Sequence, residues 1–220
     1  MPDSPIAPAP SLHELKPRLR GVLHSLAALA AIPATSLLVF HARVGTATTL
    51  ALIYGVALVL VFVTSGLFHT PSWSQAAWRR MQRLDHSMIY VLIASSSAPF
   101  AFHLEAEPRQ VILSISIGGG LLGWLKAHIW PRAPRLVTSG IYLLIGWCMA
   151  PYFPELYAKN GLASTCLLLI GDLFYSAGAL IYWLRLPDPW PRTFGYHEVN
   201  HLLGLVGATC HFLAIWSLLT

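Results

Sequence analysis

Several histidines in this chain are spaced for joint chemistry, although the chain as a whole is strongly apolar. His197 and His201 lie four residues apart, the spacing at which one helix presents two imidazoles to a single metal ion. His69 ends a long apolar run, and Asp85 lies at the start of a later one. Ionisable groups in membrane-type segments are costly and mark functional sites by default. Three imidazoles and one carboxylate at one level would suit a zinc ion with one open coordination position.

Other polar residues in the apolar segments could have purely structural roles instead of a role in a metal site. Ser65 lies four residues before His69 and would share its helix face. Ser65 could instead hydrogen-bond its own helix backbone, and Asp85 could cap the helix that it opens. His24 and His211 also lie in apolar segments, and we expect them to make buried hydrogen bonds rather than bind metal.

The segment from His197 to His201 also spells H-E-x-x-H, the motif in which metalloproteases place two zinc ligands and a general-base glutamate. It continues to Gly204, but Gly207 stands where the longer motif has a third histidine. A membrane protease would need a further ligand from a later helix, and none follows. The motif therefore favours zinc binding more than peptide cleavage, and Glu198 is expected to face water at the interface.

The composition indicates that lipid rather than water surrounds most of the chain. The chain is 55% hydrophobic and 10% charged, whereas soluble domains carry about 25% charged residues. Apolar segments close to the roughly 20 residues needed to span a membrane occur at 21–40, 46–68, 84–102, 110–127, 136–154, 161–184 and 197–218. The sequence therefore predicts an all-α membrane protein. Its seven-transmembrane helix bundle covers 20–220 and follows a flexible, Pro-rich cytoplasmic tail at 1–19.

Lysine and arginine concentrate in every second loop, which sets the predicted orientation. Of the 14 Lys and Arg, all but Arg43, Arg109 and Lys159 fall on the side of the N-terminus. Because cytoplasmic loops are rich in Lys and Arg, the N-terminus is predicted inside and, after seven spans, the C-terminus outside. The same rule accounts for the net charge of +5 without nucleic acid. Membrane lipids are the expected partners, and the oligomeric state is open.

This topology brings the candidate site to one depth near the inner membrane surface. The second helix would end there at His69, while the third and seventh would begin there with Asp85 and with the pair His197 and His201. The sequence does not establish that these three helices are neighbours. The fourth segment is the weakest span because it is short and Gly-rich. If it did not cross, the histidine pair would face the opposite side from His69.

Several sequence blocks occur in order along the chain: Ser65-x-x-x-His69, Arg83-Leu84-Asp85-His86-Ser87-Met88-Ile89-Tyr90, Pro99-Phe100, Tyr175-Ser176-Ala177-Gly178-Ala179, Gly195-Tyr196-His197-Glu198-Val199-Asn200-His201 and Cys210-His211-Phe212. In these blocks, and over almost all of 20–220, the chain resembles the hemolysin III family, the bacterial branch of the progestin and adipoQ receptor (PAQR) family. The resemblance implies seven helices in a bacterial inner (plasma) membrane. It also implies Zn²⁺ held by His69, His197 and His201, with Asp85 holding the water at the metal and Ser65 close by. Asp172 departs from the family pattern, in which a small residue is expected.

The resemblance and the residues together suggest a zinc-dependent hydrolase that cleaves an amide or ester of a membrane lipid in membrane lipid homeostasis. Relatives of the receptor branch are linked to hydrolysis of ceramides, and Asp85 could accept the proton during such a reaction. One alternative is a non-enzymatic sensor of membrane state with structural zinc. A haemolytic pore ranks last, because the apolar helices show no continuous charged stripe. The sequence leaves open whether a substrate is turned over and which lipid it is.

Overall fold

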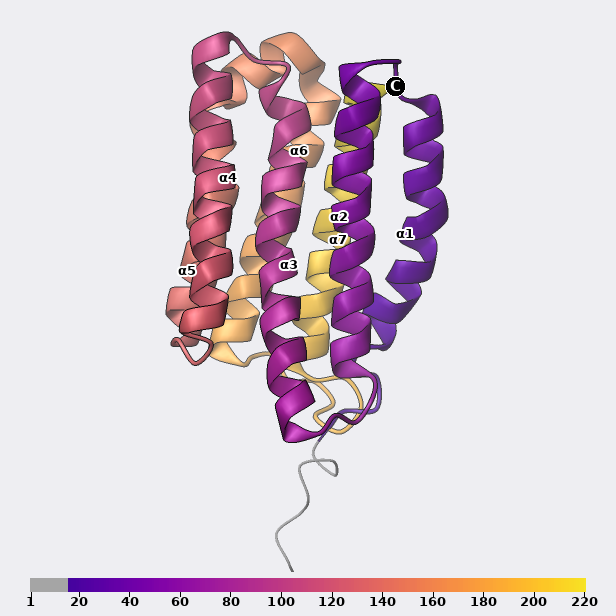
Figure 1. Cartoon of the computed structure of the whole chain (residues 1–220), viewed down its shortest axis with the longest axis vertical. Helices are drawn as coiled ribbons and strands as arrows, with labels where there is room; N and C mark the ends of the chain where they lie inside the picture. The colour runs from indigo at the N-terminus through magenta and orange to yellow at the C-terminus, as the bar shows by residue number, and fades with distance from the viewer. Residues whose placement is uncertain (1–15) are drawn as a thin grey trace, which may run out of the picture.

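The computed structural model describes residues 16–220, which form a bundle of helices (Figure 1). The helices are α1 (Val22–His41), α2 (Thr46–His69), α3 (Gln75–Ala101), α4 (Ala106–Ile129), α5 (Arg135–Gly146), the 3-10 helix η1 (Trp147–Tyr152), α6 (Phe153–Leu184) and α7 (Tyr196–Leu219). Most of the predicted tail, 1–15, lies outside the described residues. Residues 18 and 19 hydrogen-bond through their backbone N–H groups to the carbonyls of Arg192 and Thr193, each at 3.1 Å.

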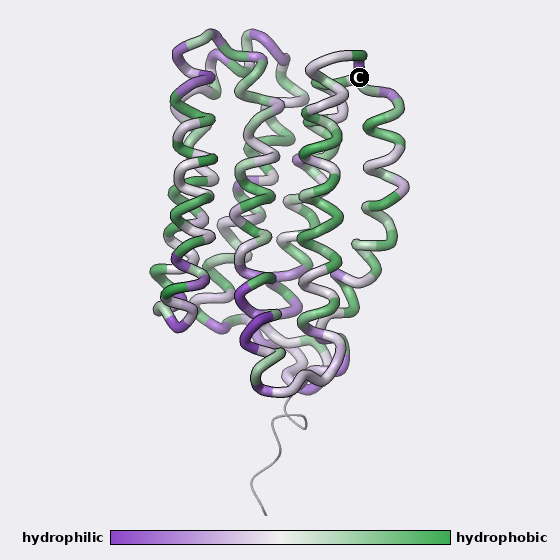
Figure 2. The backbone as a smooth tube through the Cα atoms, in the orientation of Figure 1, coloured by the Kyte–Doolittle hydropathy of each residue, from purple (hydrophilic) through white to green (hydrophobic). Residues whose placement is uncertain are grey.

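The helices stand side by side and run alternately up and down the bundle (Figure 1). We call the end at which α1, α3, α5 and α7 begin the N-terminal end; the C-terminus lies at the other end. Hydrophobic residues dominate the middle of the bundle, while hydrophilic residues gather toward its ends, most visibly in the first turns of α3 (Figure 2). This distribution is what a lipid environment requires of a helical bundle.

Five stretches of the described chain are long and apolar enough to cross a membrane. They are Val22–His41, Thr46–His69, Ala106–Ile129, Arg135–Leu184 and Tyr196–Leu219. The chain is thus an all-helical, multi-pass membrane protein. The Gly-rich fourth segment is one of these stretches and runs the length of the bundle as α4 (Figure 1). A count of seven spans with the N-terminus inside stays a prediction.

Helix α3 begins nine residues before its predicted start. The Ser74 side chain caps the helix by accepting the backbone N–H of Ala77 at 3.3 Å, so the helix begins in a polar segment that hydrophobicity alone does not reveal. Asp85 therefore lies ten residues inside α3, and its interpretation as a helix cap is wrong. The polar turns of α3 project at the N-terminal end, where they help to form the site.

The segment between 135 and 184 differs from the prediction in its boundaries. Helix α5 ends at Gly146 and continues as η1, which contains Pro151, a residue without the N–H that an α-helix uses. Helix α6 begins at Phe153, eight residues before the predicted start, but Gly161 breaks it with φ 77°. The predicted start at 161 therefore coincides with a kink inside α6.

Close helix contacts hold the bundle together where glycine replaces a side chain. A Cβ atom on Gly123 of α4 would lie 2.0 Å from Cε1 of Tyr90 on α3, and one on Gly171 of α6 would lie 2.2 Å from Cδ2 of His211 on α7. Small residues permit such close approach of helices in membrane bundles.

Helix α2 packs on both α1 and α3, and α7 contacts α1, α2, α3 and α6. Helices α2, α3 and α7 are therefore neighbours, as the predicted site requires.

Candidate metal centre

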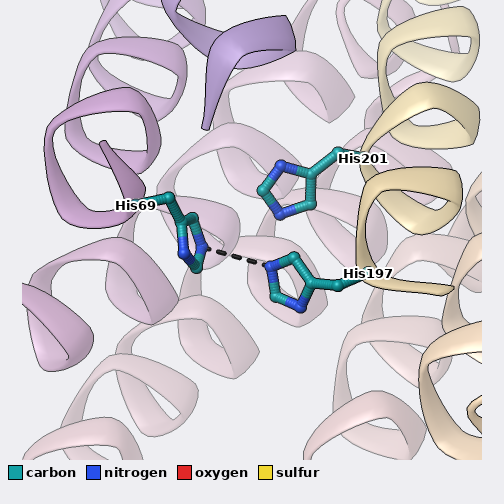
Figure 3. Close-up of side chains that lie close together, drawn as sticks. All are labelled: His69, His197 and His201. Atoms are coloured by element: carbon teal, nitrogen blue, oxygen red, sulfur yellow. Dashed lines mark hydrogen bonds between the residues drawn. The ribbon is translucent and has the colours of Figure 1, made fainter. Parts of the chain in front are cut away.

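Three histidines from two helices converge at the N-terminal end of the bundle (Figure 3). Ligand atoms of His69, His197 and His201 all lie within 4.8 Å of one another, and Nε2 of His69 is 3.2 Å from Nε2 of His197. A tetrahedral zinc ion with Zn–N bonds of about 2.0–2.1 Å separates its ligand nitrogens by about 3.4 Å. The donor set and its spacing therefore fit a metal ion held by three imidazoles.

Local structure at the start of α7 positions two of these histidines. His197 and His201 are one turn apart on α7, so both rings project toward the end of α2 (Figure 3). Glu198 lies between them and accepts the backbone N–H of Gly195 at 2.8 Å, which caps the helix. It also pairs with Arg20, which precedes α1. Glu198 is only 2% exposed, so the expectation that it faces water is wrong.

Asp85 and Ser65 lie beside the three histidines. Oδ2 of Asp85 is 4.0 Å from Nε2 of His69, which is too long for a hydrogen bond. Ser65 is buried on α2, and its Oγ lies 2.8 Å from Nδ1 of His24. Ser65 thus joins α2 to α1 rather than hydrogen-bonding to its own helix. A carboxylate at this distance from the histidines could interact with a further group at a metal ion held by them.

His24 is a part of the site that the sequence did not reveal. Its ring stacks on that of His201, with centroids 3.9 Å apart and planes 14° apart. The expectation of a buried hydrogen bond is confirmed by the contact with Ser65, while His24 Nε2 is buried without a partner. The sequence does contain a signal for this role: the predicted topology begins the first helix at the same end as the third and seventh helices, which places His24 at the depth of the other histidines.

A cavity of about 520 Å³ connects this cluster with the middle of the bundle. Its N-terminal end is lined by the three histidines, Asp85 and Ser65, and its depth mainly by apolar and aromatic residues. Farther in, the cavity reaches Asp172 and His211, whose Oδ1 and Nε2 atoms are 3.3 Å apart. Asp172, the departure from the family pattern, therefore has His211 as its partner. The cavity places a candidate metal site at one end of an elongated, mainly apolar chamber.

Comparison with known proteins agrees with this architecture. A family model described as "Haemolysin-III related" matches residues 12–212. The chain is 28% identical over 205 residues to the hemolysin-3 homolog of Bacillus subtilis (strain 168), covering 88% of this chain and 90% of that protein. It is 29% identical over 203 residues to hemolysin-3 of Bacillus cereus, covering 88% and 87%. The adiponectin receptor protein of Drosophila melanogaster is 25% identical over 216 residues, covering 87% and 48%. The chain therefore belongs to the hemolysin III family, within the wider PAQR family.

Proposed function

We propose that this protein is a zinc-dependent hydrolase that cleaves an amide or ester bond of a membrane lipid. The observation that carries the proposal is the opening of the histidine cluster into the 520 Å³ cavity. A structural zinc site is closed by four protein ligands, whereas a catalytic site keeps one position open. Three histidines with a carboxylate 4.0 Å from one of them match the open type.

The cavity has the dimensions and lining of a site for a lipid chain. His201 and His211 lie ten residues apart on α7, which corresponds to about 15 Å along the helix axis. The wall of the cavity includes the apolar side chains of Ile89, Leu92 and Met149. A single acyl chain could occupy this apolar part while its amide or ester group lies at the histidine cluster. Burial of the chain would fix the position of the bond to be cleaved.

The residues around the cluster have distinct roles in such a reaction. When bound, Zn²⁺ would act as a Lewis acid toward a carbonyl oxygen and activate water. Asp85 would accept the proton that water loses as its oxygen adds to the carbonyl carbon. It would return that proton to the leaving nitrogen or oxygen when the C–N or C–O bond breaks. His24 would hold His201 in place through the stacked rings, and Ser65 would hold His24 through its hydrogen bond.

A structural role for zinc is the second candidate. The three ligands come from α2 and α7 only, so a metal ion would tie together the last turn of one helix and the first turn of the other. In that case the protein would report a membrane state to partners. Loss of a ligand would lower thermal stability, and no lipid would be turned over at saturating zinc.

Hydrolysis by purified protein separates the two candidates. Wild-type protein in lipid nanodiscs is incubated with ceramides and phospholipids, and released fatty acid is measured by mass spectrometry. Asp85→Asn should lower the rate by about 100-fold or more, because general-base catalysis contributes that much, while zinc remains bound. Glu107→Gln, at an exposed position of α4, serves as a control of equal charge change. Turnover that persists in Asp85→Asn and after removal of zinc would contradict the proposal, as would the absence of turnover on the whole panel.

A further inference from the structure

A second cavity lies at the N-terminal end of the bundle, outside the histidine cluster. It has a volume of about 600 Å³ and lies between the first turns of α3, the end of α4 and the start of α5. Its lining contains four arginines: Arg79, Arg83, Arg132 and Arg135. No acidic residue is among the described residues that line it. The cavity is therefore a concentration of positive charge without a compensating carboxylate.

The guanidinium groups in this cavity are mostly free to bind a ligand. In the described part of the chain, no hydrogen bond or ion pair engages the guanidinium groups of Arg79, Arg83 and Arg132, and Nε of Arg83 is buried without a partner. Only Arg135 is held in place, by the carbonyl of Tyr182 at 3.3 Å and by the ring of that residue. Buried polar groups in proteins normally have partners. An unpaired arginine nitrogen inside a basic cavity points to an anion as the missing partner.

Tryptophans place this cavity at the level of the membrane interface. Six exposed tryptophans lie in the N-terminal turns of α3, at the ends of α4 and α6 and in the loops beside them: Trp73, Trp78, Trp124, Trp130, Trp183 and Trp190. Tryptophan is enriched at the boundary between hydrocarbon and water. Trp78 itself lines the cavity. The arginines therefore lie where lipid headgroups lie, and basic pockets between membrane helices bind anionic headgroups.

From these observations we infer that the arginine cavity binds a phosphate-bearing anion. Guanidinium groups form paired hydrogen bonds with phosphate oxygens and remain charged at all physiological pH values. The phosphate could belong to the headgroup of an anionic lipid or to free phosphate. His86, Arg135 and Tyr182 line both this cavity and the one that holds the histidine cluster, so the bound anion lies next to the candidate metal centre. The inference does not depend on hydrolysis or on bound metal.

Binding to the full-length protein in detergent tests the inference. The titrants are dihexanoyl phosphatidylglycerol, inorganic phosphate and a short-chain diacylglycerol that lacks phosphate. Arg83→Gln and Arg132→Gln are compared with Arg80→Gln, which removes the same charge from an exposed position outside the cavity. The anionic lipid should bind to wild type and to Arg80→Gln. Its affinity should fall by about tenfold or more in the two cavity variants, the equivalent of one charge-assisted hydrogen bond. Diacylglycerol should not bind at the cavity.

Competition by inorganic phosphate identifies the source of the anion. If phosphate displaces the lipid and its own binding weakens in Arg83→Gln, the cavity accepts free phosphate. If millimolar phosphate does not displace a lipid whose binding depends on the arginines, the cavity requires the headgroup with its chains. Both results support the inference. It is overturned if neither anion binds, or if Arg83→Gln and Arg132→Gln bind the anionic lipid as tightly as Arg80→Gln while their melting temperatures match that of wild type.

Discussion

The imidazole of His24 lies flat against that of His201, with 3.9 Å between ring centroids. Nδ1 of His24 is hydrogen-bonded to Oγ of Ser65, so the ring cannot turn without losing that hydrogen bond. The stack therefore fixes the plane of a candidate metal ligand from a helix that supplies no ligand itself. Residues that orient ligands in this way commonly change metal affinity when they are removed.

His24→Ala should weaken zinc binding by about tenfold, the lower end of the effect of orienting residues. His24→Phe should weaken it less, because a flat ring still packs on His201 although the bond to Ser65 is lost. Affinity is measured by competition with a chromophoric chelator. His41→Ala, at the far end of α1, is the matched control. Equal affinities of His24→Ala and His41→Ala would show that the stack does not support the site.

Arg20, which is partly exposed, forms an ion pair with the buried Glu198 and so joins the segment before α1 to the first turn of α7. Arg20→Gln would leave the Glu198 carboxylate, which is 2% exposed, without its charged partner. We expect a loss of about 3 kcal/mol in the free energy of unfolding, since breaking a buried pair from one side is costly. The double variant Arg20→Gln/Glu198→Gln should recover part of this loss. Unfolding by detergent titration gives the values, with exposed Arg18→Gln as the control.

Asp172 and His211 form a second pair, in which both side chains are buried. Oδ2 of Asp172 has no hydrogen-bond partner among the described residues. The contact of Oδ1 with His211 therefore provides most of the stabilisation that offsets the burial of this side chain. His211→Phe should destabilise the protein by about 3 kcal/mol, because it leaves the Asp172 carboxylate alone in an apolar region. Asp172→Asn combined with His211→Phe should be more stable than His211→Phe alone. If the double variant is the less stable of the two, the pair is not the reason for the loss.

Glycines of α4 offer a matched test of helix packing. Gly123→Ala would place a methyl group 2.0 Å from Tyr90, whereas Gly118→Ala meets no atom within 4 Å. The first change should cost about 2 kcal/mol through overpacking. The second should be neutral or stabilise the helix by up to about 1 kcal/mol, since alanine is the better helix former. Thermal unfolding of the two variants side by side measures the difference; similar melting temperatures would contradict the close contact of α3 and α4.

The sequence predicts the helices whose limits coincide with the limits of an apolar run. The segments predicted at 21–40, 46–68 and 197–218 differ by at most one residue at each end from α1, α2 and α7. The first turns of α3 were missed because they are polar and rest on the Ser74 cap. The division between α5 and α6 was misplaced because η1 and the break at Gly161 interrupt one long apolar run.

Some features of the candidate site follow from local sequence and can be predicted, whereas others depend on how distant helices pack. The spacing of His197 and His201 is local, so the sequence reveals that they share a helix face. Their approach to His69 depends on the packing of α2 beside α7, which spacing cannot show. The stack of His24 on His201 and the burial of Glu198 by Arg20 are contacts between distant segments. They became visible only with the fold.

Metal analysis tests most directly the proposal that His69, His197 and His201 together hold one metal ion. Wild-type protein and the variants His69→Ala, His197→Ala, His201→Ala and His128→Ala are purified in parallel, loaded with zinc, desalted and analysed by plasma mass spectrometry. Wild type and His128→Ala, whose ring bonds its own helix, should retain about one zinc per chain, and each cluster variant should lose most of it. Full zinc content in all three cluster variants, or none in wild type, would contradict the claim.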